Sequence, residues 1–382
     1  MLAAMGLLVT GLWSCKHDDV PVDSVTVRPS ATELEIGSTY QLSAVVLPGD
    51  APQDLEWTSS RQTVATVSNT GLVTAVAAGE CDITVYASDK SDVCHITVVD
   101  RGGNPQGPDN SVAFDANGAS KALFSVSDTK KVKFSKGNLQ YQASTGTWRF
   151  AENQTDYIGD GNANISSSYS GWIDLFGWGT SGWNSGANAY QPWATSTSYS
   201  DYYPGGSYTN SLTGAYANAD WGVYNAISNG GNQAGMWRTL TKDEWEYLLN
   251  SRAASTINGV ANARYAKAVV NGTNGLVIFP DNFTMPSGIS YPSRINTAGG
   301  SFTSNTYTES QWSQMEAAGA IFLPAAGFRY GTEVDRVGTF GNYWASTYDS
   351  EVIAWYMGFS DGNLVVDYRN RYYGLSVRLV RD

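Results

Sequence analysis

Helical periodicity is restricted to two short stretches of this 382-residue chain, and that restriction limits its fold more than any other feature. Elsewhere, short runs of alternating apolar and polar residues are separated by Gly, Pro, Asn and Ser, which is typical of strands joined by turns. At about 150 residues per domain, the length allows two or three domains. The sequence therefore predicts a mainly β protein with several domains and two short helices.

The two helices are expected at residues 240–252 and 309–317. In the first, Trp245, Leu248 and Leu249 fall on one helical face. Each helix is expected to begin with a capping box, in which a Thr and a Glu or Gln three residues later bond each other's backbone N–H. The capping pairs are Thr241 with Glu244 and Thr308 with Gln311.

The chain begins with an apolar run, residues 2–13, that is too short to span a bilayer and has the length of a signal-peptide core. Residues 12–15 (Leu-Trp-Ser-Cys) resemble a bacterial lipobox, which implies cleavage before Cys15 and lipidation of its thiol. Residues 16–19 (Lys-His-Asp-Asp) resemble the surface-export signal of Bacteroidetes lipoproteins. We therefore expect a signal peptide at 1–15, a tether at 16–21 and a lipid-anchored protein exposed on the outer membrane. The alternative is an ordinary secretory signal with an incidental Cys15.

Residues 22–100 contain short strands and no helical period, which suits an antiparallel sandwich. Strands are expected at 24–28, 40–47, 55–58, 65–68, 72–76, 81–86 and 93–99. The Val25-Thr26-Val27 strand, the 57–60 segment (Trp-Thr-Ser-Ser) and the 71–75 segment (Gly-Leu-Val-Thr-Ala) resemble the bacterial Ig-like family of group 2. The resemblance implies an Ig-like β-sandwich, and we expect Trp57 to belong to its core.

Cys81 and Cys94 lie on the last two strands of this segment and are expected to point into the core. An exported location permits a disulfide between them. A turn centred on residues 88–91 would instead place Cys81 opposite Val98, beyond bridging distance of Cys94. Both alternatives, a disulfide and two separate thiols, remain open at this point. A zinc site is not expected, because it needs more ligands than these thiols and His95 supply.

Residues 101–121 are expected to form a linker, because 101–110 are rich in Gly, Pro and Asn. The head, 122–382, follows. Its segments 236–247, 322–329, 341–347 and 374–380 resemble the formylglycine-generating-enzyme type of C-type lectin fold. Together with 134–141, they resemble the Fibrobacter succinogenes major paralogous domain family. The resemblance implies an α+β C-type-lectin-like domain with long loops.

The head contains no Cys and no His, since the cysteines are Cys15, Cys81 and Cys94 and the histidines are His17 and His95. Nucleophile–imidazole chemistry, the copper-holding cysteine pair of the family's enzymes and an imidazole metal site are therefore excluded there. A carboxylate pair is the remaining enzymatic option. The candidates, among which no spacing singles out a pair, are Asp243, Glu244, Glu246, Asp335, Asp349, Asp361 and Asp367. We expect no catalysis, no cofactor and no metal.

Two further segments have a structural and a functional interpretation. Residues 160–164 (Asp-Gly-Asn-Ala-Asn) space oxygen ligands as calcium loops do, but a simple Asx and Gly turn is the favoured interpretation. Trp172, Phe176, Trp178 and Trp183 are expected to pack in the core rather than to stack on sugars.

The expected binding surface lies between residues 348 and 373, where Tyr, Asp, Asn, Ser and Arg cluster as they do in antibody binding loops. The alternative is a solvated sheet face with ordinary turns. The expected ligand-binding residues are Tyr348, Asp349, Ser350, Asp361, Asn363, Asp367, Tyr368, Arg369, Asn370, Arg371, Tyr372 and Tyr373. Their placement resembles the variable region of diversity-generating-retroelement target proteins.

The leading hypothesis is a non-catalytic surface lipoprotein whose head binds an extracellular protein or glycan. A structural component of a fimbria-like assembly is the alternative, and a carboxylate-based glycan enzyme is the third. With a net charge of −12 and no cluster of Lys and Arg, no nucleic-acid partner is expected.

Overall fold

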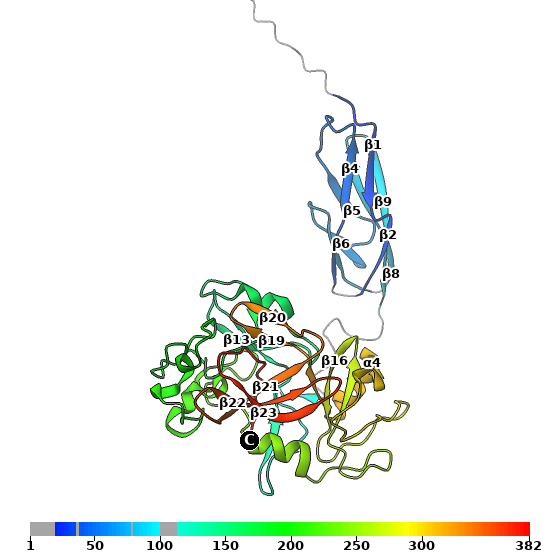
Figure 1. Ribbon diagram of the computed structural model, residues 1–382. Coiled ribbons are helices and arrows are strands. Elements are labelled where there is room, and N and C mark those ends of the chain that lie inside the picture. Colours follow the sequence, from blue (N-terminus) through cyan, green and yellow to red (C-terminus); the bar gives the residue numbers. More distant parts are fainter. Residues whose placement is uncertain (1–19, 36–37, 78, 100–112) are drawn as a thin grey trace, which may run out of the picture. The chain divides into compact units, whose positions relative to one another are not determined.

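The computed structural model describes residues 20–35, 38–77, 79–99 and 113–382 (Figure 1). They form two compact units, one on each side of residues 100–112, and each is described by itself. Strands dominate both units and the helices are few and short, as predicted. The leader, Cys15 and residues 16–19 of the tether lie outside the described residues.

The first unit is an Ig-like sandwich built from short strands. The strands are β1 (Ser24–Arg28), β2 (Ala31–Glu35), β3 (Thr39–Gln41), β4 (Ser43–Leu47), β5 (Glu56–Ser59), β6 (Ala65–Val67), β7 (Leu72–Ala75), β8 (Gly79–Ala87) and β9 (Lys90–Val99). They form sheets ordered β2-β9-β8-β5, β3-β7-β6 and β1-β4. Val73, Ile83, Val85 and Ile96 are fully enclosed between the sheets, and Trp57 joins the same core, as predicted.

All seven expected strands are present, with two differences. The expected 40–47 strand is broken at Leu42, whose side chain is buried, and its two halves belong to different sheets. Strand β2 was not predicted, because its alternation of Thr, Glu and Leu is short, and it pairs in parallel with β9.

Strands β8 and β9 form the hairpin that carries the two thiols. A two-residue turn at Ser88 and Asp89 closes it, so Cys81 faces Ile96 and Cys94 faces Ile83. The register that a turn centred on residues 88–91 would give, with Cys81 opposite Val98, differs from the observed one by two residues. Both cysteines are buried and free, and burial raises the pKa of the Cys94 thiol to about 11.

The second unit begins earlier than predicted. Phe114 and Ala119 are buried, and Ala119 forms a bridge with Ser135. The segment from 113 to 121 is thus part of the head and not of the linker, because its apolar side chains find a core to enter.

The head is assembled from several small sheets. Its strands are β10 (Phe124–Ser125), β11 (Lys131–Phe134), β12 (Leu139–Gln142), β13 (Thr147–Phe150), β14 (Trp172–Ile173), β15 (Tyr265–Val270), β16 (Thr273–Ile278), β17 (Thr306–Tyr307), β18 (Ile321–Pro324), β19 (Phe328–Tyr330), β20 (Glu333–Asp335), β21 (Gly341–Tyr348), β22 (Ile353–Phe359), β23 (Leu364–Asn370) and β24 (Val380–Arg381). The sheets are ordered β10-β11-β24, β13-β12-β14, β17-β15-β16-β18, β19-β20 and β21-β22-β23. Because β24 pairs with β11, the two sequence ends of the head close one sheet.

Both predicted capping boxes are present. Helix α3 (Lys242–Glu246) begins at Thr241 and continues as a π-turn, η5 (Tyr247–Ser251), and α4 (Glu309–Ala317) begins at Thr308. The other helical segments are α2 (Trp221–Tyr224) and the 3-10 turns η1 (Gly159–Asn164), η2 (Tyr199–Tyr202), η3 (Pro204–Gly206), η4 (Gly214–Ala219) and η6 (Phe302–Ser304). Within the described residues, no helix has both the length and the apolar character that a membrane crossing requires.

Candidate functional site

The predicted binding residues lie on and beside the β21-β22-β23 sheet. In this sheet Trp355 faces Tyr368 and Ala354 faces Arg369. Because successive side chains of a strand point to opposite faces, Tyr368 and Arg369 lie on different sides of the sheet. The structure therefore divides the predicted surface into separate groups.

The largest group is the Arg369 cluster, in which aromatic rings surround one guanidinium. The Arg369 Cζ lies 4.4 Å from the ring centroid of Phe328, 4.8 Å from that of Tyr373 and 5.7 Å from that of Tyr356. Arg369 Nη1 donates to Asn342 Oδ1 over 3.2 Å. The cluster consists of Phe328, Tyr330, Tyr356, Arg369, Tyr372 and Tyr373.

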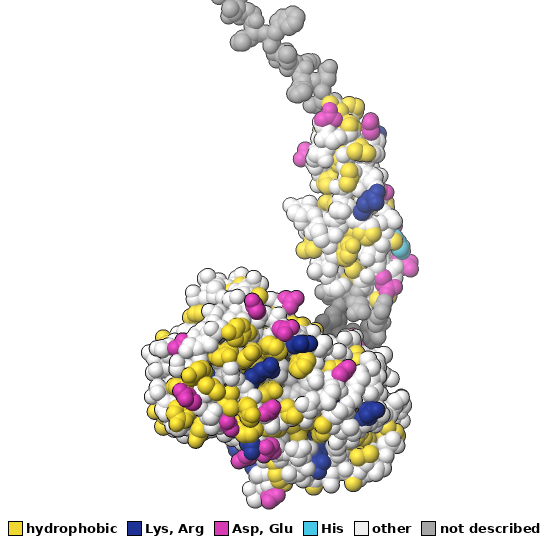
Figure 2. Space-filling view, in the orientation of Figure 1, with side chains coloured by type: hydrophobic (Ala, Val, Ile, Leu, Met, Phe, Trp, Pro, Cys, Tyr) yellow, Lys and Arg dark blue, Asp and Glu magenta, His cyan; other side chains and the backbone are white. Residues whose placement is uncertain are grey.

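Three tyrosines form the outer part of the Arg369 cluster. Tyr372 and Tyr373 are stacked with centroids 5.2 Å apart, and Tyr330 packs on both. Tyr330 is 41% exposed, whereas the other rings are half-buried. Figure 2 shows hydrophobic side chains gathered on this face of the head, over the strands β19 to β22 labelled in Figure 1. The sequence identified Arg369, Tyr372 and Tyr373 but missed Phe328, Tyr330 and Tyr356, which come from another hairpin and from the neighbouring strand.

Arg371 is not on the surface, contrary to the prediction. Its side chain is 0% exposed, and Nη2 donates to the carbonyl oxygens of Tyr208 and Ser350 over 2.6 and 2.9 Å. Its Cζ lies 4.5 Å from the Trp178 ring and 5.2 Å from the Tyr203 ring. Arg371 is buried because the loop around residues 203–208 covers it, and local sequence patterns carry no signal for such a distant cover. We call Trp178, Tyr203, Tyr208, Ser350 and Arg371 the Arg371 cluster.

Tyr368 projects from the opposite face of the sheet. It is 54% exposed and makes an edge contact with Trp355, with centroids 6.1 Å apart. The Lys242 ammonium lies 4.9 Å from the same Trp355 ring. This group is a smaller aromatic surface beside helix α3.

Asp361 has a structural role that the sequence analysis did not anticipate. Its carboxylate accepts hydrogen bonds from Phe302 N over 2.8 Å and from Ser301 Oγ over 3.3 Å, which holds the start of η6. Its backbone oxygen accepts from Lys267 Nζ. Both carboxylate oxygens of Asp361 are therefore used in hydrogen bonds to Ser301 and Phe302.

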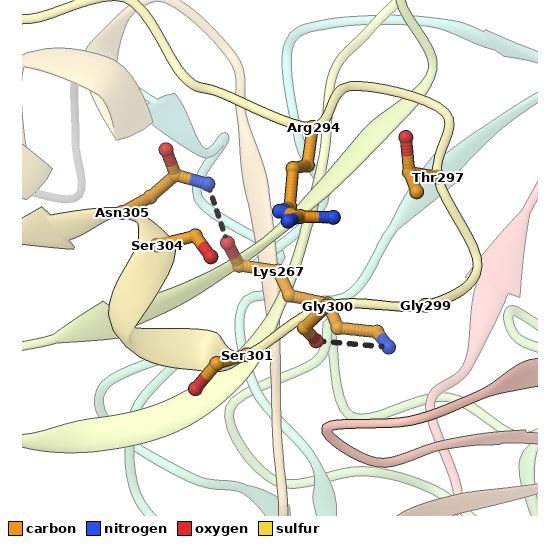
Figure 3. A pocket seen from close by; sticks show the side chains of 8 residues that line it. All are labelled: Lys267, Arg294, Thr297, Gly299, Gly300, Ser301, Ser304 and Asn305. Carbon is orange, nitrogen blue, oxygen red and sulfur yellow. Dashed lines mark hydrogen bonds between the residues drawn. The ribbon is translucent and has the colours of Figure 1, made fainter.

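Lys267 lies at the centre of a small polar hollow (Figure 3). Its ammonium donates to the backbone oxygens of Ala298, Gly300 and Asp361 over 2.5, 3.4 and 3.3 Å, and Asn305 Nδ2 donates to the Lys267 carbonyl over 2.7 Å. Burial lowers the pKa of Lys267 to about 8. The three carbonyl groups accept the hydrogen bonds that this ammonium can donate. Lys267 therefore joins the loop at residues 298–300 to the turn at Asp361.

The remaining predicted residues make individual hydrogen bonds, in two of which, those of Asn363 and Asp367, the side chain accepts from a backbone N–H. The backbone N–H groups of Asp349 and Ser350 donate to the Ile353 carbonyl in the turn between β21 and β22. The carboxamide of Asn363 and the carboxylate of Asp367 accept from the next residue's N–H. Tyr348 N donates to Ser211 Oγ, and Asn370 Nδ2 donates to the Tyr372 hydroxyl.

In each of the two segments with alternative interpretations, the central side chains are buried in the fold. Residues 160–164 belong to η1, where Asn162 is buried and its amide donates to Asp174 Oδ1 over 2.8 Å. Phe176 and Trp178 are fully buried, and Trp172 and Trp183 are half-buried. The core interpretation of the aromatic run is thus confirmed for its two central rings.

The candidate acids of a carboxylate mechanism bond to neighbours. Glu244 accepts from both Nη atoms of Arg238 over 2.7 and 2.9 Å and also completes the capping box. Glu246 pairs with Lys242, and Asp335 accepts from Arg336 N. Asp243 is close to Lys242 on the same exposed first turn.

The most perturbed acids were missed by the sequence analysis. Burial raises the pKa of Asp174 and of Asp220 to about 6 and that of Glu316 to about 7. Each has a fixed partner: Asn162 donates to Asp174, Thr239 N to Asp220, and Gln154 to Glu316. Only tertiary burial distinguishes these acids from exposed ones. Among the described residues, no group of three His, Cys, Asp or Glu side chains is arranged to hold a metal ion.

Two segments of the chain match different domain-family models. Residues 21–98 match the bacterial Ig-like domain of group 2. Residues 298–380, which contain the whole Arg369 cluster, match a domain of unknown function, DUF8237.

One curated relative is the lacto-N-biosidase of Bifidobacterium bifidum, which is 43% identical over 82 residues. That match covers 21% of this chain and only 7% of the relative.

Two solved structures are similar in part. The match to domains 4 and 5 of the S-layer protein SbsC is 20% identical, covers 21% of this chain and 53% of that one, and has a TM-score of 0.20. The match to an Ig-like-domain-containing GH10 xylanase from termite gut is 25% identical, covers 22% and 23%, and has a TM-score of 0.15. The match at residues 21–98 shows that the chain carries a bacterial Ig-like domain of group 2, which precedes a separate β-rich head in the sequence.

Proposed function

We propose that the head is a non-catalytic recognition domain that binds an extracellular protein or glycan, and that the chain is a surface lipoprotein with a C-type-lectin-like head. The observation that carries the proposal is the Arg369 cluster. Tyrosine rings and an arginine at a partly exposed site provide a large contact area at low entropic cost. They stand on the β21-β22-β23 sheet and the β19-β20 hairpin, and a rigid scaffold of this kind holds recognition groups in place.

Anchoring through Cys15 and exposure on the outer membrane belong to the same proposal. They rest on the lipobox-like sequence and on the Ig-like domain that follows it. Diversification of residues 348–373 by a retroelement is also part of it. A near-identical adenine-rich copy of this region beside a reverse transcriptase gene would support diversification, and a gene without both would contradict it.

We propose that the head is not catalytic because it lacks the side chains that most covalent mechanisms need. The head has no Cys and no His, and the acids with raised pKa values are held by structural partners. A nucleophile with an adjacent base, which most covalent mechanisms need, is not assembled among the described residues.

The test is a binding screen of the full chain on combined glycan and protein arrays. We expect specific binding that is lost in a Tyr330→Ala, Tyr372→Ala double variant. Matched controls are Tyr224→Ala and Tyr291→Ala, which remove exposed tyrosines elsewhere on the head. Binding that survives in the double variant would place the site elsewhere, and the Trp355–Tyr368 pair would be tested next by Tyr368→Ala. If neither array shows specific binding, the recognition proposal is wrong.

A further inference from the structure

Arg369 has two hydrogen-bond donors that no group of the Arg369 cluster uses. Its Nη1 donates to Asn342 Oδ1 over 3.2 Å, whereas its Nε and Nη2 find no acceptor among the described residues. The same residues include buried donors without a partner, for example in Arg371 and Arg378, but none of these buried atoms belongs to Arg369. The Nε and Nη2 atoms of Arg369 are therefore unpaired and in contact with solvent.

These two atoms form one edge of the guanidinium. Nε and Nη2 point their N–H groups in parallel, as a fork that matches the two oxygens of a carboxylate. The contact with Asn342 uses Nη1, which does not belong to this edge. The Asn342 amide is itself fixed, because its Nδ2 donates to the Gly327 carbonyl over 3.2 Å and its Oδ1 is left to accept from Arg369. Asn342 thus holds the guanidinium and leaves the Nε–Nη2 fork free.

Aromatic rings hold the guanidinium as well. The centroids of Phe328, Tyr373 and Tyr356 lie 4.4, 4.8 and 5.7 Å from Arg369 Cζ. These cation–π contacts orient the group without accepting its hydrogen bonds. A fork that is already held in place loses less conformational entropy when a ligand binds, so the free edge of Arg369 is a preorganised site.

The surroundings of the fork favour a protein ligand over a glycan. Tyr and Arg are enriched at the energetic centre of protein–protein interfaces. Tyr330 is 41% exposed, and hydrophobic side chains gather on this face of the head (Figure 2), as they do at protein interaction sites. The nearby carboxamides that could bind sugar hydroxyls, those of Asn342 and Asn370, are already bonded to other side chains.

The charge of the ligand follows from the fork alone. With a net charge of −12, the chain does not attract anions in general, so an anionic ligand must be held locally. We infer that the Arg369 cluster binds an acidic protein segment, whose Asp or Glu carboxylate pairs with Nε and Nη2 of Arg369 while a neighbouring apolar side chain packs on Tyr330 and Tyr372. This inference rests on the proposed recognition function and adds the chemical class of the ligand.

Asp367 is an acid beside this site. It precedes Arg369 by two residues on β23, so both side chains lie on the same face of the sheet, and both act electrostatically on Tyr356. Its Oδ1 accepts from Tyr368 N over 2.9 Å, and it forms no ion pair with Arg369. Asp367 therefore leaves the fork empty, but its charge repels the carboxylate of a ligand.

The experiment is isothermal titration calorimetry of the full chain with the pentapeptide Gly-Phe-Glu-Phe-Gly, blocked at both ends so that the Glu side chain carries its charge. The uncharged counterpart has Gln in place of Glu, and trigalacturonate supplies carboxylates on a glycan. We expect the Glu peptide to bind about tenfold more tightly than the Gln peptide, because hydrogen bonds to a charged group are stronger. No measurable binding of the Glu peptide, equal affinity for the two peptides, or tighter binding of trigalacturonate would overturn the inference.

Arg369→Lys tests the fork separately from the charge. Lysine keeps the positive charge beside the rings, but its ammonium has no planar fork. We expect the variant to bind the Glu peptide about fivefold to tenfold less tightly, with little change for the Gln peptide. Arg149→Lys is the matched control, because Arg149 also lies over a ring, that of Trp172 at 3.8 Å, and donates to an amide oxygen, that of Gln140. Wild-type affinity of Arg369→Lys for the Glu peptide would contradict the inference.

Asp367→Asn tests the site in the opposite direction. Removing this charge should tighten binding of the Glu peptide about twofold to threefold at low salt and leave the Gln peptide unaffected. A gain in affinity cannot result from a damaged fold, and weaker binding of the Glu peptide would argue against an anion site. Array binding that is lost in the Tyr330→Ala, Tyr372→Ala variant but retained in Arg369→Lys would leave the recognition proposal standing while refuting this inference.

Discussion

Three buried acids, Glu316, Asp174 and Asp220, make the stability of the head depend on pH. The pKa of Glu316 is raised from 4.5 to about 7 by burial, so the folded head holds its proton at pH values where the unfolded chain has released it. The contribution to stability is therefore fully present below pH 4.5 and is lost as the pH rises through about 7. Asp174 and Asp220 act in the same direction, with pKa values raised to about 6.

We predict that Glu316→Gln reduces the loss of stability between pH 5 and pH 8. A shift of about 2.5 pKa units corresponds to roughly 3.5 kcal/mol, because one unit is about 1.4 kcal/mol. The Gln side chain can still accept the hydrogen bond from Gln154. Urea unfolding at both pH values measures the difference, and Glu309→Gln, at an exposed position on the same helix, is the control. Parallel pH profiles for the wild type and Glu316→Gln would contradict the prediction.

At the level of secondary-structure elements, a single substitution can remove a capping box and so weaken the start of a helix. Thr308 accepts from Gln311 N and thereby satisfies one N–H at the start of α4. Thr308→Ala should reduce the free energy of unfolding by about 1 kcal/mol, the usual cost of losing an N-cap. Thr332→Ala, in the exposed turn between β19 and β20, should change it by less than about 0.5 kcal/mol. Chemical denaturation of both variants tests the cap, and equal effects would rule it out.

The register of the β8–β9 hairpin makes a prediction about its thiols. Cys81 and Cys94 are diagonal neighbours on one face, and such residues are about 7–8 Å apart, beyond the usual reach of a disulfide. A Cys15→Ser chain purified under air should therefore yield two thiols per molecule when titrated in denaturant. A yield of zero, with no dimer on a non-reducing gel, would show that the register shifts to form the bridge.

Local signals predicted the elements better than they predicted the site. The capping pairs Thr241–Glu244 and Thr308–Gln311 and most strands of the Ig-like domain follow from spacing, because their determinants lie within a few residues. Arg371 and Asp361 carry the residue types of a binding loop, yet the structure uses them to hold the 203–208 loop and η6. Phe302, which Asp361 holds, is 59 residues distant from it, and Tyr208 is 163 residues distant from Arg371, so no local pattern could reveal those roles. The same holds for Tyr330 and Phe328, which join Arg369 only through the fold.

On the scale of the whole molecule, the two units have separate cores. Ile83 is buried in the Ig-like domain and Ile321 in the head, and no residue is shared between their core clusters. We predict two calorimetric unfolding transitions. Ile83→Ala should lower one melting temperature and Ile321→Ala the other, each through a destabilisation of about 2–5 kcal/mol. If either substitution moves both transitions together, the units unfold cooperatively and the prediction is wrong.

The pairing of β24 with β11 has a consequence for biogenesis. Whether the chain emerges from a ribosome or from an export channel, it emerges from its first residue onward, and a domain can fold once its residues have emerged. The Ig-like domain closes its sheets within about eighty residues, and it can fold while the rest is still emerging. The head must wait for residues 380–381 before Lys133 and Phe134 obtain their partners Arg381 and Val380. Until then, β11 presents an open edge of the kind that invites aggregation. Removal of residues 380 and 381 would therefore be more damaging to this head than a much larger lesion in one of its loops.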